Sequence, residues 1–183
     1  FVHTMNNMGN PDTMIIDPVL KYRVVAHTIP PVESKVITIL PGEHTVIPLK
    51  TPQGKLKITI KTKEDYQFIV KQSNQNETIN VQKINNSQSY LTGFYDIELL
   101  TLPRQYFKNI RINQNQLTQL QLPSTGLANI LLPANGYGGV YLKDGDKLTE
   151  IYKFNGESNQ YKLTLLPGKY KVIYRSKSSK KYI

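Results

Sequence analysis

The chain has no cysteine and no tryptophan among its 183 residues. The absence of cysteine excludes disulfides, thiolate metal sites and a cysteine nucleophile together. No apolar run approaches the roughly 18 residues that a membrane-spanning helix needs, so we expect no transmembrane segment. Acidic residues are few, because 13 Asp and Glu stand against 23 Lys and Arg, a formal net charge of +10. Such an excess favours partners with acidic surfaces.

What the chain does contain is the composition of strands and turns. Hydrophobic residues make up 39%, enough for a core, and there are 12 Tyr, 11 Gly and 11 Pro. Polar and apolar side chains alternate with the two-residue period of half-buried strands in residues 35–39, 55–60 and 117–122. Turn residues separate the apolar runs, as at Pro41-Gly42 and Pro167-Gly168. No stretch carries a helical apolar stripe with a cap, so the sequence predicts an all-β fold.

Two glycine-containing segments predict local strand geometry. Asp144-Gly145, flanked by apolar strand residues, predicts a hairpin and not a calcium loop, because the later ligands of such a loop are absent. The segment Gly136-Tyr137-Gly138-Gly139 is not followed by a helical pattern, so it predicts a bulge or tight bend entering a strand instead of a phosphate-binding loop.

A repeat of about seventy residues runs through the chain. Residues 21–30 and 94–103 match at their tyrosines and at the Thr-x-Pro that closes each segment. The register continues through residues 35–49 and 108–122, and it aligns residues 54–58 with 126–130. A third copy begins near Leu165 and is cut off by the end of the chain. A register held across four consecutive segments favours a true repeat over chance similarity between strands.

The repeat predicts tandem small antiparallel β-sandwich modules of Ig-like or prealbumin-like type. We expect a partial sandwich at residues 1–50 that lacks its N-terminal strands, a complete one at 51–123, and a third at 124–183, whole or truncated at its C-terminus. Both ends read as cuts through a domain, which predicts a fragment of a larger polypeptide, with a mature processed chain as the alternative. The first copy should expose a strand edge unless the rest of a longer chain or a partner covers it.

Several stretches resemble known proteins. The segment Leu166-Pro167-Gly168-Lys169-Tyr170-Lys171-Val172 is similar to the closing strands of carboxypeptidase regulatory-like and Cna-B-like sandwiches. Residues 2–13, 95–104 and 136–141 resemble the C-terminal region of secreted von Willebrand factor A domain-containing proteins of the Bacteroidetes. In that family the A domain, with its metal-ion-dependent adhesion site, lies upstream of the sandwiches. No Asp-x-Ser-x-Ser motif occurs in this chain, so the roles of that domain map onto none of its residues.

No motif in the sequence predicts catalysis. The histidines His3, His27 and His44 are too scattered for a metal-binding element. No nucleophile elbow, His-Glu-x-x-His or phosphate-cradling Gly-Lys-Ser/Thr loop occurs. We therefore expect no enzymatic activity, no cofactor and no metal site.

Three sets of side chains are candidates for partner contacts. Thr13 lies in an Asp-Thr-hydrophobic pattern that resembles the O-glycosylation site of Bacteroidetes envelope proteins. Four tyrosines would stack on glycan rings if they share one face, or fill the core in place of Trp: Tyr137, Tyr141, Tyr152 and Tyr161. Basic residues crowd the last fifteen positions and favour an acidic partner such as an anionic glycan, with nucleic acid disfavoured: Lys169, Lys171, Arg175, Lys177, Lys180 and Lys181.

Together these features predict a non-catalytic structural and interaction module of a secreted or cell-envelope protein, in the periplasm or on the cell surface. Its work would be to space and present a binding domain, the A domain in the resembled family, and to dock protein partners of a surface assembly. Two alternatives stay open. One is a direct adhesin or glycan-binding module that uses the Tyr and Asn/Gln faces. The other is a subunit of a larger envelope assembly, bound through exposed strand edges at residues 1–30 or at the basic C-terminal strand.

Overall fold

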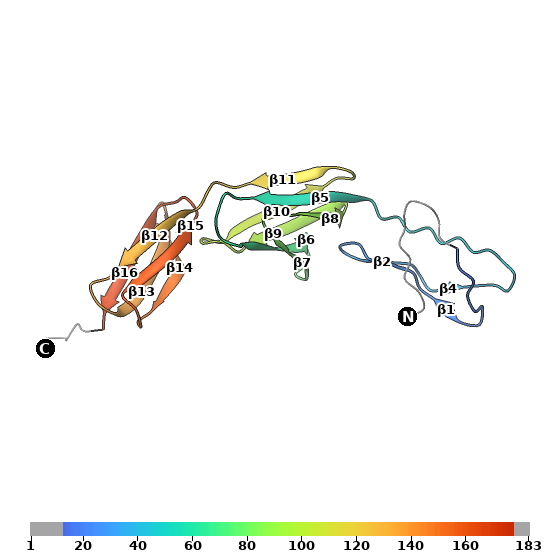
Figure 1. Ribbon diagram of the computed structural model, residues 1–183, viewed down its shortest axis with the longest axis horizontal. Helices are drawn as coiled ribbons and strands as arrows, with labels where there is room; N and C mark the ends of the chain where they lie inside the picture. The colour runs from blue at the N-terminus through green and yellow to red at the C-terminus, as the bar shows by residue number, and fades with distance from the viewer. Residues whose placement is uncertain (1–12, 178–183) are drawn as a thin grey trace. The chain divides into compact units, whose positions relative to one another are not determined.

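The computed structural model of the chain describes residues 13–177. In this range the protein forms sixteen β-strands and no helix, so the all-β prediction is confirmed (Figure 1). The chain divides into two compact units. The first holds the residues through His27 together with Pro31–Thr51, and the second holds Thr28–Pro30 with everything from Pro52 onward.

The first unit contains two short antiparallel strand pairs. β1 (Lys21–Tyr22) pairs with β4 (Ile37–Thr38), and β2 (Val25–Ala26) pairs with β3 (Val32–Glu33). No residue from 13 to 51 is buried. A two-stranded hairpin without a covered apolar face is only marginally stable, so these strands lack the core that would hold them.

The middle sheet pair, residues 52–123, consists of two sheets over one core. One sheet has the order β10-β9-β6-β7 and the other β11-β5-β8. All of its strand pairs are antiparallel except β11–β5, which is parallel. Its core is built around Tyr90, Tyr95 and Phe68, which are fully buried. The strands are β5 (Gln53–Thr59), β6 (Gln67–Gln72), β7 (Thr78–Lys83), β8 (Ser87–Leu91), β9 (Gly93–Leu99), β10 (Gln105–Ile112) and β11 (Leu117–Gln121).

The C-terminal sheet pair, residues 126–176, has the sheets β12-β15 and β14-β13-β16. Its core is centred on Phe154, which stacks on Tyr161 with ring centroids 4.4 Å apart. The strands are β12 (Gly126–Leu131), β13 (Gly136–Asp144), β14 (Lys147–Asn155), β15 (Gln160–Leu165) and β16 (Tyr170–Ser176).

The five C-terminal strands repeat the pairing of β5–β9. β12 pairs with β15 as β5 pairs with β8, and β13 pairs with β14 and β16 as β6 pairs with β7 and β9. In the middle sheet pair, β10 then covers the edge of β9, and β11 covers the edge of β5. Within the described residues the C-terminal sheet pair has no counterpart of either strand.

The first unit contains the counterparts of those later strands. Tyr22 opposes Ile37 in the same relation as Tyr95 opposes Ile110. In the first unit the pairing register shifts by one residue between the pairs Tyr22–Ile37 and Val25–Glu33. It shifts by the same amount between Tyr95–Ile110 and Ile97–Phe107 of β9 and β10, so the β-bulge recurs as well. The strands β1–β4 therefore correspond to β9 and β10.

A tyrosine near the start of β1, β9 and β16 bonds to a carbonyl upstream of the strand. The hydroxyl of Tyr95 donates to the carbonyl of Leu91 at 2.7 Å, and that of Tyr170 donates to the carbonyl of Leu166 at 2.5 Å. The hydroxyl of Tyr22 donates to a carbonyl five residues upstream at 2.7 Å. This is the bond of a tyrosine corner, which ties a strand to the loop before it.

The Thr-x-Pro turns of the repeat also share one geometry. Thr28 Oγ1 donates to the carbonyl of Pro30 at 2.7 Å, and Thr101 Oγ1 donates to the carbonyl of Pro103 at 2.8 Å. Both prolines follow a cis peptide bond. The matched threonines therefore serve the same local bond.

The two glycine predictions have different outcomes. The hairpin at Asp144-Gly145 is confirmed, since Asp144 opposes Lys147 and Gly145 has a φ of +56°. The segment 136–139 forms the first residues of β13, and the bulge lies just after it, between Val140 and Tyr141. A Cβ on Gly138 would lie 2.0 Å from the carbonyl oxygen of Ile173, so close approach of β16 explains that glycine.

Candidate functional site

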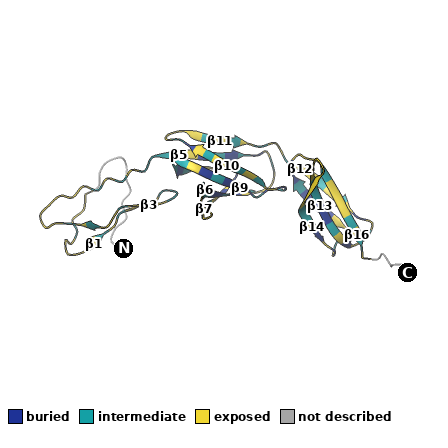
Figure 2. Ribbon diagram, turned by 180° about the vertical axis from the view of Figure 1, so that it is seen from behind, coloured by how far each residue is buried: buried dark blue, intermediate teal, exposed yellow. Residues whose placement is uncertain are grey.

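Four strands lie at the ends of the sheets in the C-terminal sheet pair, and two of them, β16 and β12, are those whose counterparts in the middle sheet pair are covered. Within residues 13–177, β16 ends one sheet and β12 ends the other, and no strand pairs with β16 on the side away from β13 or with β12 on the side away from β15. Exposed residues run along β16 in Figure 2. Large apolar side chains are exposed on both strands: Leu127, Leu131, Val172 and Ile173.

The core beneath these edges is only partly covered. Val172 opposes the buried Val140 across β13 and β16, so its side chain lies on the core face. It is nevertheless 43% exposed, whereas Ile97, at the matching place in β9, is 2% exposed. In the middle sheet pair β10 and β11 supply the apolar side chains that close this side of the core.

The basic residues predicted as partner contacts lie along β16. Lys169, Lys171, Arg175 and Lys177 are all exposed, and none forms an ion pair with any residue of the described range. The ammonium of Lys177 lies 5.1 Å from the ring centroid of Tyr137. Lys180 and Lys181 lie outside the described residues. The edge strand is therefore positively charged and free to meet an acidic group.

The four tyrosines predicted as a glycan platform do not share one exposed face. Tyr161 is 7% exposed and belongs to the core, and Tyr152 packs against that core in a T-shaped ring pair with Phe154. Tyr137 is 54% exposed, and the Tyr141 hydroxyl donates to Glu150 at 2.9 Å, which raises the pKa of that phenol. Glycan stacking itself stays a prediction for Tyr137 and Tyr141.

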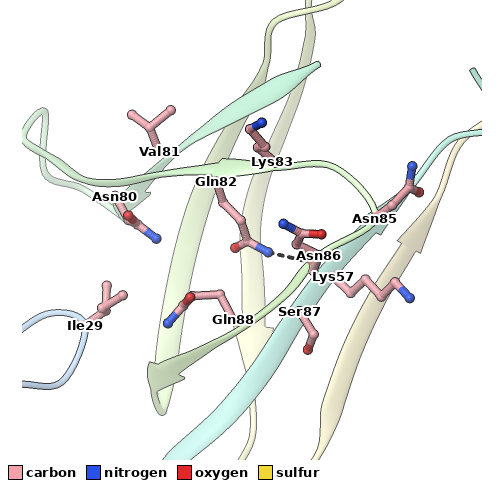
Figure 3. A pocket seen from close by; sticks show the side chains of 10 residues that line it. All are labelled: Ile29, Lys57, Asn80, Val81, Gln82, Lys83, Asn85, Asn86, Ser87 and Gln88. Atoms are coloured by element: carbon pink, nitrogen blue, oxygen red, sulfur yellow. Dashed lines mark hydrogen bonds between the residues drawn. The ribbon is translucent and has the colours of Figure 1, made fainter. Parts of the chain in front are cut away.

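A polar hollow of about 600 Å³ lies beside β7 and β8 (Figure 3). Its amide side chains come from residues 80–88, which are rich in Asn and Gln, but the fold already uses several of them. Gln82 donates to the carbonyls of Leu56 and Asn86, at 3.2 and 2.8 Å, and accepts from Tyr90 at 2.8 Å. Asn80 donates to the Tyr90 hydroxyl at 2.8 Å. Few amides of the hollow are therefore left to bind a ligand.

Burial keeps Tyr90 in its neutral form. Burial raises the pKa of Tyr90 to about 12, although the hydrogen bond from Asn80 acts in the opposite direction. Burial likewise raises the pKa of Tyr95 to about 12. These phenols serve the core, since both rings are fully buried and 5.7 Å apart.

The remaining candidates for a metal site, a modification site or a membrane-spanning segment add no functional site among the described residues. Residues 13–177 hold no cluster of three His, Asp or Glu side chains that could ligate a metal ion. Thr13 is exposed and lies before the first strand, and His3 lies outside the described residues. No helix in the described part of the chain is long and apolar enough to cross a membrane.

Sequence reasoning missed several residues of the open edges. It singled out the charges of β16 but not Val172, nor Gly126 and Leu127 on β12. Extending the repeat strand by strand would have found them, because no strand of residues 13–177 covers β16 and β12 as β10 and β11 cover β9 and β5.

The fold and its surfaces define an all-β protein with uncovered sheet edges and no metal-ligating cluster among its described residues. Comparison with known proteins adds no relative: no protein-family model, no curated protein and no solved structure matches this chain.

Proposed function

We propose that this chain is a non-catalytic structural and interaction protein, a series of small Ig-like or prealbumin-like β-sandwich modules that space and present a binding domain. The resemblance to secreted von Willebrand factor A domain-containing proteins of the Bacteroidetes supports a place in a secreted or cell-envelope protein, with the A domain as the presented part. Protein partners of a surface assembly, and an anionic glycan at β16, fit the charge of that strand.

The observation that carries the proposal is the close joint between the middle and C-terminal sheet pairs. Only residues 122–125 separate β11 from β12. The hydroxyl of Tyr66 donates to the carbonyl of Thr164 at 3.2 Å, and Thr164 Oγ1 donates to Glu64 at 3.0 Å. The amide of Leu166 donates to the carbonyl of Leu102, in the Thr-x-Pro turn, at 2.8 Å. A spacer needs such joints, because a flexible linker would let the presented domain collapse toward its anchor.

The hydrogen bond between the Leu166 amide and the Leu102 carbonyl has a counterpart at the other Thr-x-Pro turn, which supports a series of modules joined in the same way. The carbonyl of Ile29, at the same position of the other Thr-x-Pro turn, accepts from the amide of Leu91 at 2.8 Å. Leu91 ends β8 as Leu166 follows β15, so both turns contact the same place in a sheet pair.

Limited proteolysis tests the spacer. A double variant, Glu64→Ala with Tyr66→Phe, removes two hydrogen bonds of the joint, worth about 1–2 kcal/mol together. We expect a broad-specificity protease to cut residues 122–125 roughly 5- to 30-fold faster in this variant. Tyr106→Phe is the matched control, since its exposed hydroxyl contacts Glu98 and Arg104, both within the middle sheet pair. If the wild-type linker is cut as fast as that of the double variant, the joint is flexible and the spacer proposal is wrong.

The open edges favour a second candidate function, that of a subunit in a larger envelope assembly bound through exposed strand edges. β16 and β12 supply the uncovered apolar surface that such binding requires.

A further inference from the structure

We propose that a second copy of this chain completes the C-terminal sheet pair, by adding its residues 32–39 to β16 and its residues 44–49 to β12. The inference rests on the edge-bound assembly just proposed and names its partner. It does not depend on the spacer function, whose readout, cleavage of residues 122–125, is separate.

The docking sites are defined by what the middle sheet pair has and the C-terminal one lacks. β10 pairs antiparallel with β9, and β11 pairs parallel with β5. Their counterparts β16 and β12 are both edge strands with nothing on these sides among the described residues. A complete copy therefore needs one antiparallel strand beside β16 and one parallel strand beside β12.

The N-terminal unit holds segments that match the two absent strands. Residues 32–39 match β10 in sequence, in pairing register and in the position of the bulge. Residues 44–49 match β11 through Thr45, Ile47 and Leu49. In the single chain β3 and β4 are each held by only two residue pairs. These short pairings would be replaced by a longer strand pairing on docking.

The apolar side chains of this segment are the ones the C-terminal core needs. In the middle sheet pair Ile110, Ile112, Leu120 and Leu122 pack on or in the core. Their counterparts in the first unit are four apolar residues, none of which is buried: Ile37, Ile39, Ile47 and Leu49. The acceptor core is open at the same side. Ala128 and Ile130 are half-buried where Leu56 and Ile58 are fully buried, and Val172 is exposed where Ile97 is buried. Burial of such surface is the main driving force for association.

Gly126 gives independent support. In the middle sheet pair its counterpart, Gly54, admits the β10–β11 turn: a Cβ there would lie 2.1 Å from the carbonyl oxygen of Asn113. A Cβ on Gly126 would meet nothing within 4 Å, and its φ is not left-handed. A strand glycine with no such need weakens the strand. The docked turn at Leu40, the counterpart of Asn113, accounts for it.

Two further residues of the donor fit the proposed register. Pro48 corresponds to Gln121. The main-chain amide of the next residue, Leu122, donates to the carbonyl of Thr59, and successive amides of a strand point to opposite sides. The amide at position 121 therefore points away from β5. A proline is therefore tolerated there. Glu33, which forms an exposed ion pair with Arg23 in the single chain, would oppose Ile173, between Lys171 and Arg175 of β16. Docking would therefore exchange Arg23 for basic residues that are otherwise unpaired.

Self-association of the full chain is the first test. Light scattering coupled to gel filtration, over about 1 to 100 µM, should show the mean mass rising from that of one chain toward two or more. If each chain docks its donor segment on the next chain, the oligomers grow in number of chains with concentration. If two chains dock on each other, a dimer forms. Both results support the proposal. A chain that stays monomeric throughout this range overturns it, including one that closes on itself.

Substitutions at two adjacent residues of the donor segment 44–49 distinguish the proposed docking from non-specific association. Ile47→Asp puts a charge on the side chain aimed at the acceptor core, and we expect self-association to weaken more than about tenfold. Val46→Asp adds the same charge one residue away, on a side chain that is 75% exposed and would face outward, and should leave association unchanged. Neither residue is buried in the single chain, so both variants should fold. Equal effects of the two substitutions would count against the proposed register.

Gly126→Ala tests the acceptor without altering the single chain. The added methyl should block the docked turn and weaken association more than about tenfold, while Asn129→Ala on the same strand should leave it intact. Circular dichroism of dilute samples should show unchanged unfolding for both. Association that survives Gly126→Ala contradicts the predicted contact.

Disulfide trapping tests the register directly, because the chain has no cysteine of its own. Mixing a Glu33→Cys chain with an Ile173→Cys chain under mild oxidation should give a mixed disulfide dimer, as these positions match the paired Tyr106 and Glu98. A Lys171→Cys chain is the control, since it offers a thiol on the same face two residues away. Equal trapping at 171 and 173, or none at 173, refutes the strand pairing.

Discussion

Gly54 offers a sharp test of how the middle sheet pair is closed. Replacing it with Ala would place the new Cβ 2.1 Å from the carbonyl oxygen of Asn113 and 2.9 Å from Ile112 Cγ2. Both distances are shorter than real carbon contacts, so the β10–β11 turn must move away from β5. That turn is fixed by main-chain bonds, from Asn115 to Gln53 at 2.9 Å and from Lys55 to Gln116 at 2.8 Å.

The expected cost follows from these contacts. Overpacking of a close-packed site costs about 1–3 kcal/mol, and each of the two main-chain bonds adds about 0.5–1.5 kcal/mol if it is lost. The total is about 2–6 kcal/mol, a large part of the 5–15 kcal/mol that stabilises an ordinary domain. Urea unfolding followed by circular dichroism measures it.

Gly126→Ala is the matched control, because Gly126 occupies the same place in the repeat but has open space where Gly54 has Asn113. At dilutions that keep the chain monomeric, its unfolding free energy should change by less than about 0.5 kcal/mol or rise slightly. Equal losses for Gly54→Ala and Gly126→Ala, or no loss for either, would refute the reasoning that the β10–β11 turn is what requires the glycine.

Three further predictions concern the tyrosines and one carboxylate. Tyr95→Phe removes the bond to the Leu91 carbonyl and should cost about 1–3 kcal/mol in urea unfolding, whereas Tyr22→Phe, whose acceptor is exposed, should cost under about 0.5 kcal/mol. Because burial raises the pKa of Tyr90 and Tyr95 to about 12 in the folded state, their contribution is complete below the unfolded pKa of 10.0 and is lost as pH rises through 12. Unfolding free energy should fall by about 2–3 kcal/mol per tyrosine over that interval, and Tyr95→Phe should make the decline shallower. Asp96 accepts from Ser73 and from the amide of Asn109, which lowers its pKa, so its contribution is present at neutral pH and lost as pH falls through the lowered value. An acid titration of Asp96→Asn should accordingly be flatter than that of the wild type, and identical curves would contradict this role.

Much of the fold was readable from the sequence. Alternation at residues 55–60 and 117–122 predicted strands that the structure forms as β5 and β11, and Asp144-Gly145 predicted the β13–β14 hairpin. These succeed because side-chain alternation and turn chemistry act over a few residues. The matched tyrosines and Thr-x-Pro segments were visible too. In the structure Thr28 and Thr101 make the same local hydrogen bond, and Tyr22 and Tyr95 each donate to a carbonyl four or five residues upstream.

The candidate site was less readable. Alternation shows that neighbouring side chains face opposite sides of a strand but not which side meets a core, so Tyr161 could be assigned to either a glycan platform or the interior. The amides near Gln82 were visible as a polar stretch, yet only the fold shows that Tyr90 and the Leu56 carbonyl already engage them.

By itself, the sequence determined the strand content, the order of the repeat and the absence of cysteine chemistry, all properties of local patterns and composition. Only the tertiary structure decided that β11 pairs in parallel with β5, that β16 and β12 are left as edges, and that Gly54 is crowded while Gly126 is not. The physical reason is that strand pairing and steric closure depend on segments far apart in the chain, and the same local pattern fits an edge strand and a central one equally well.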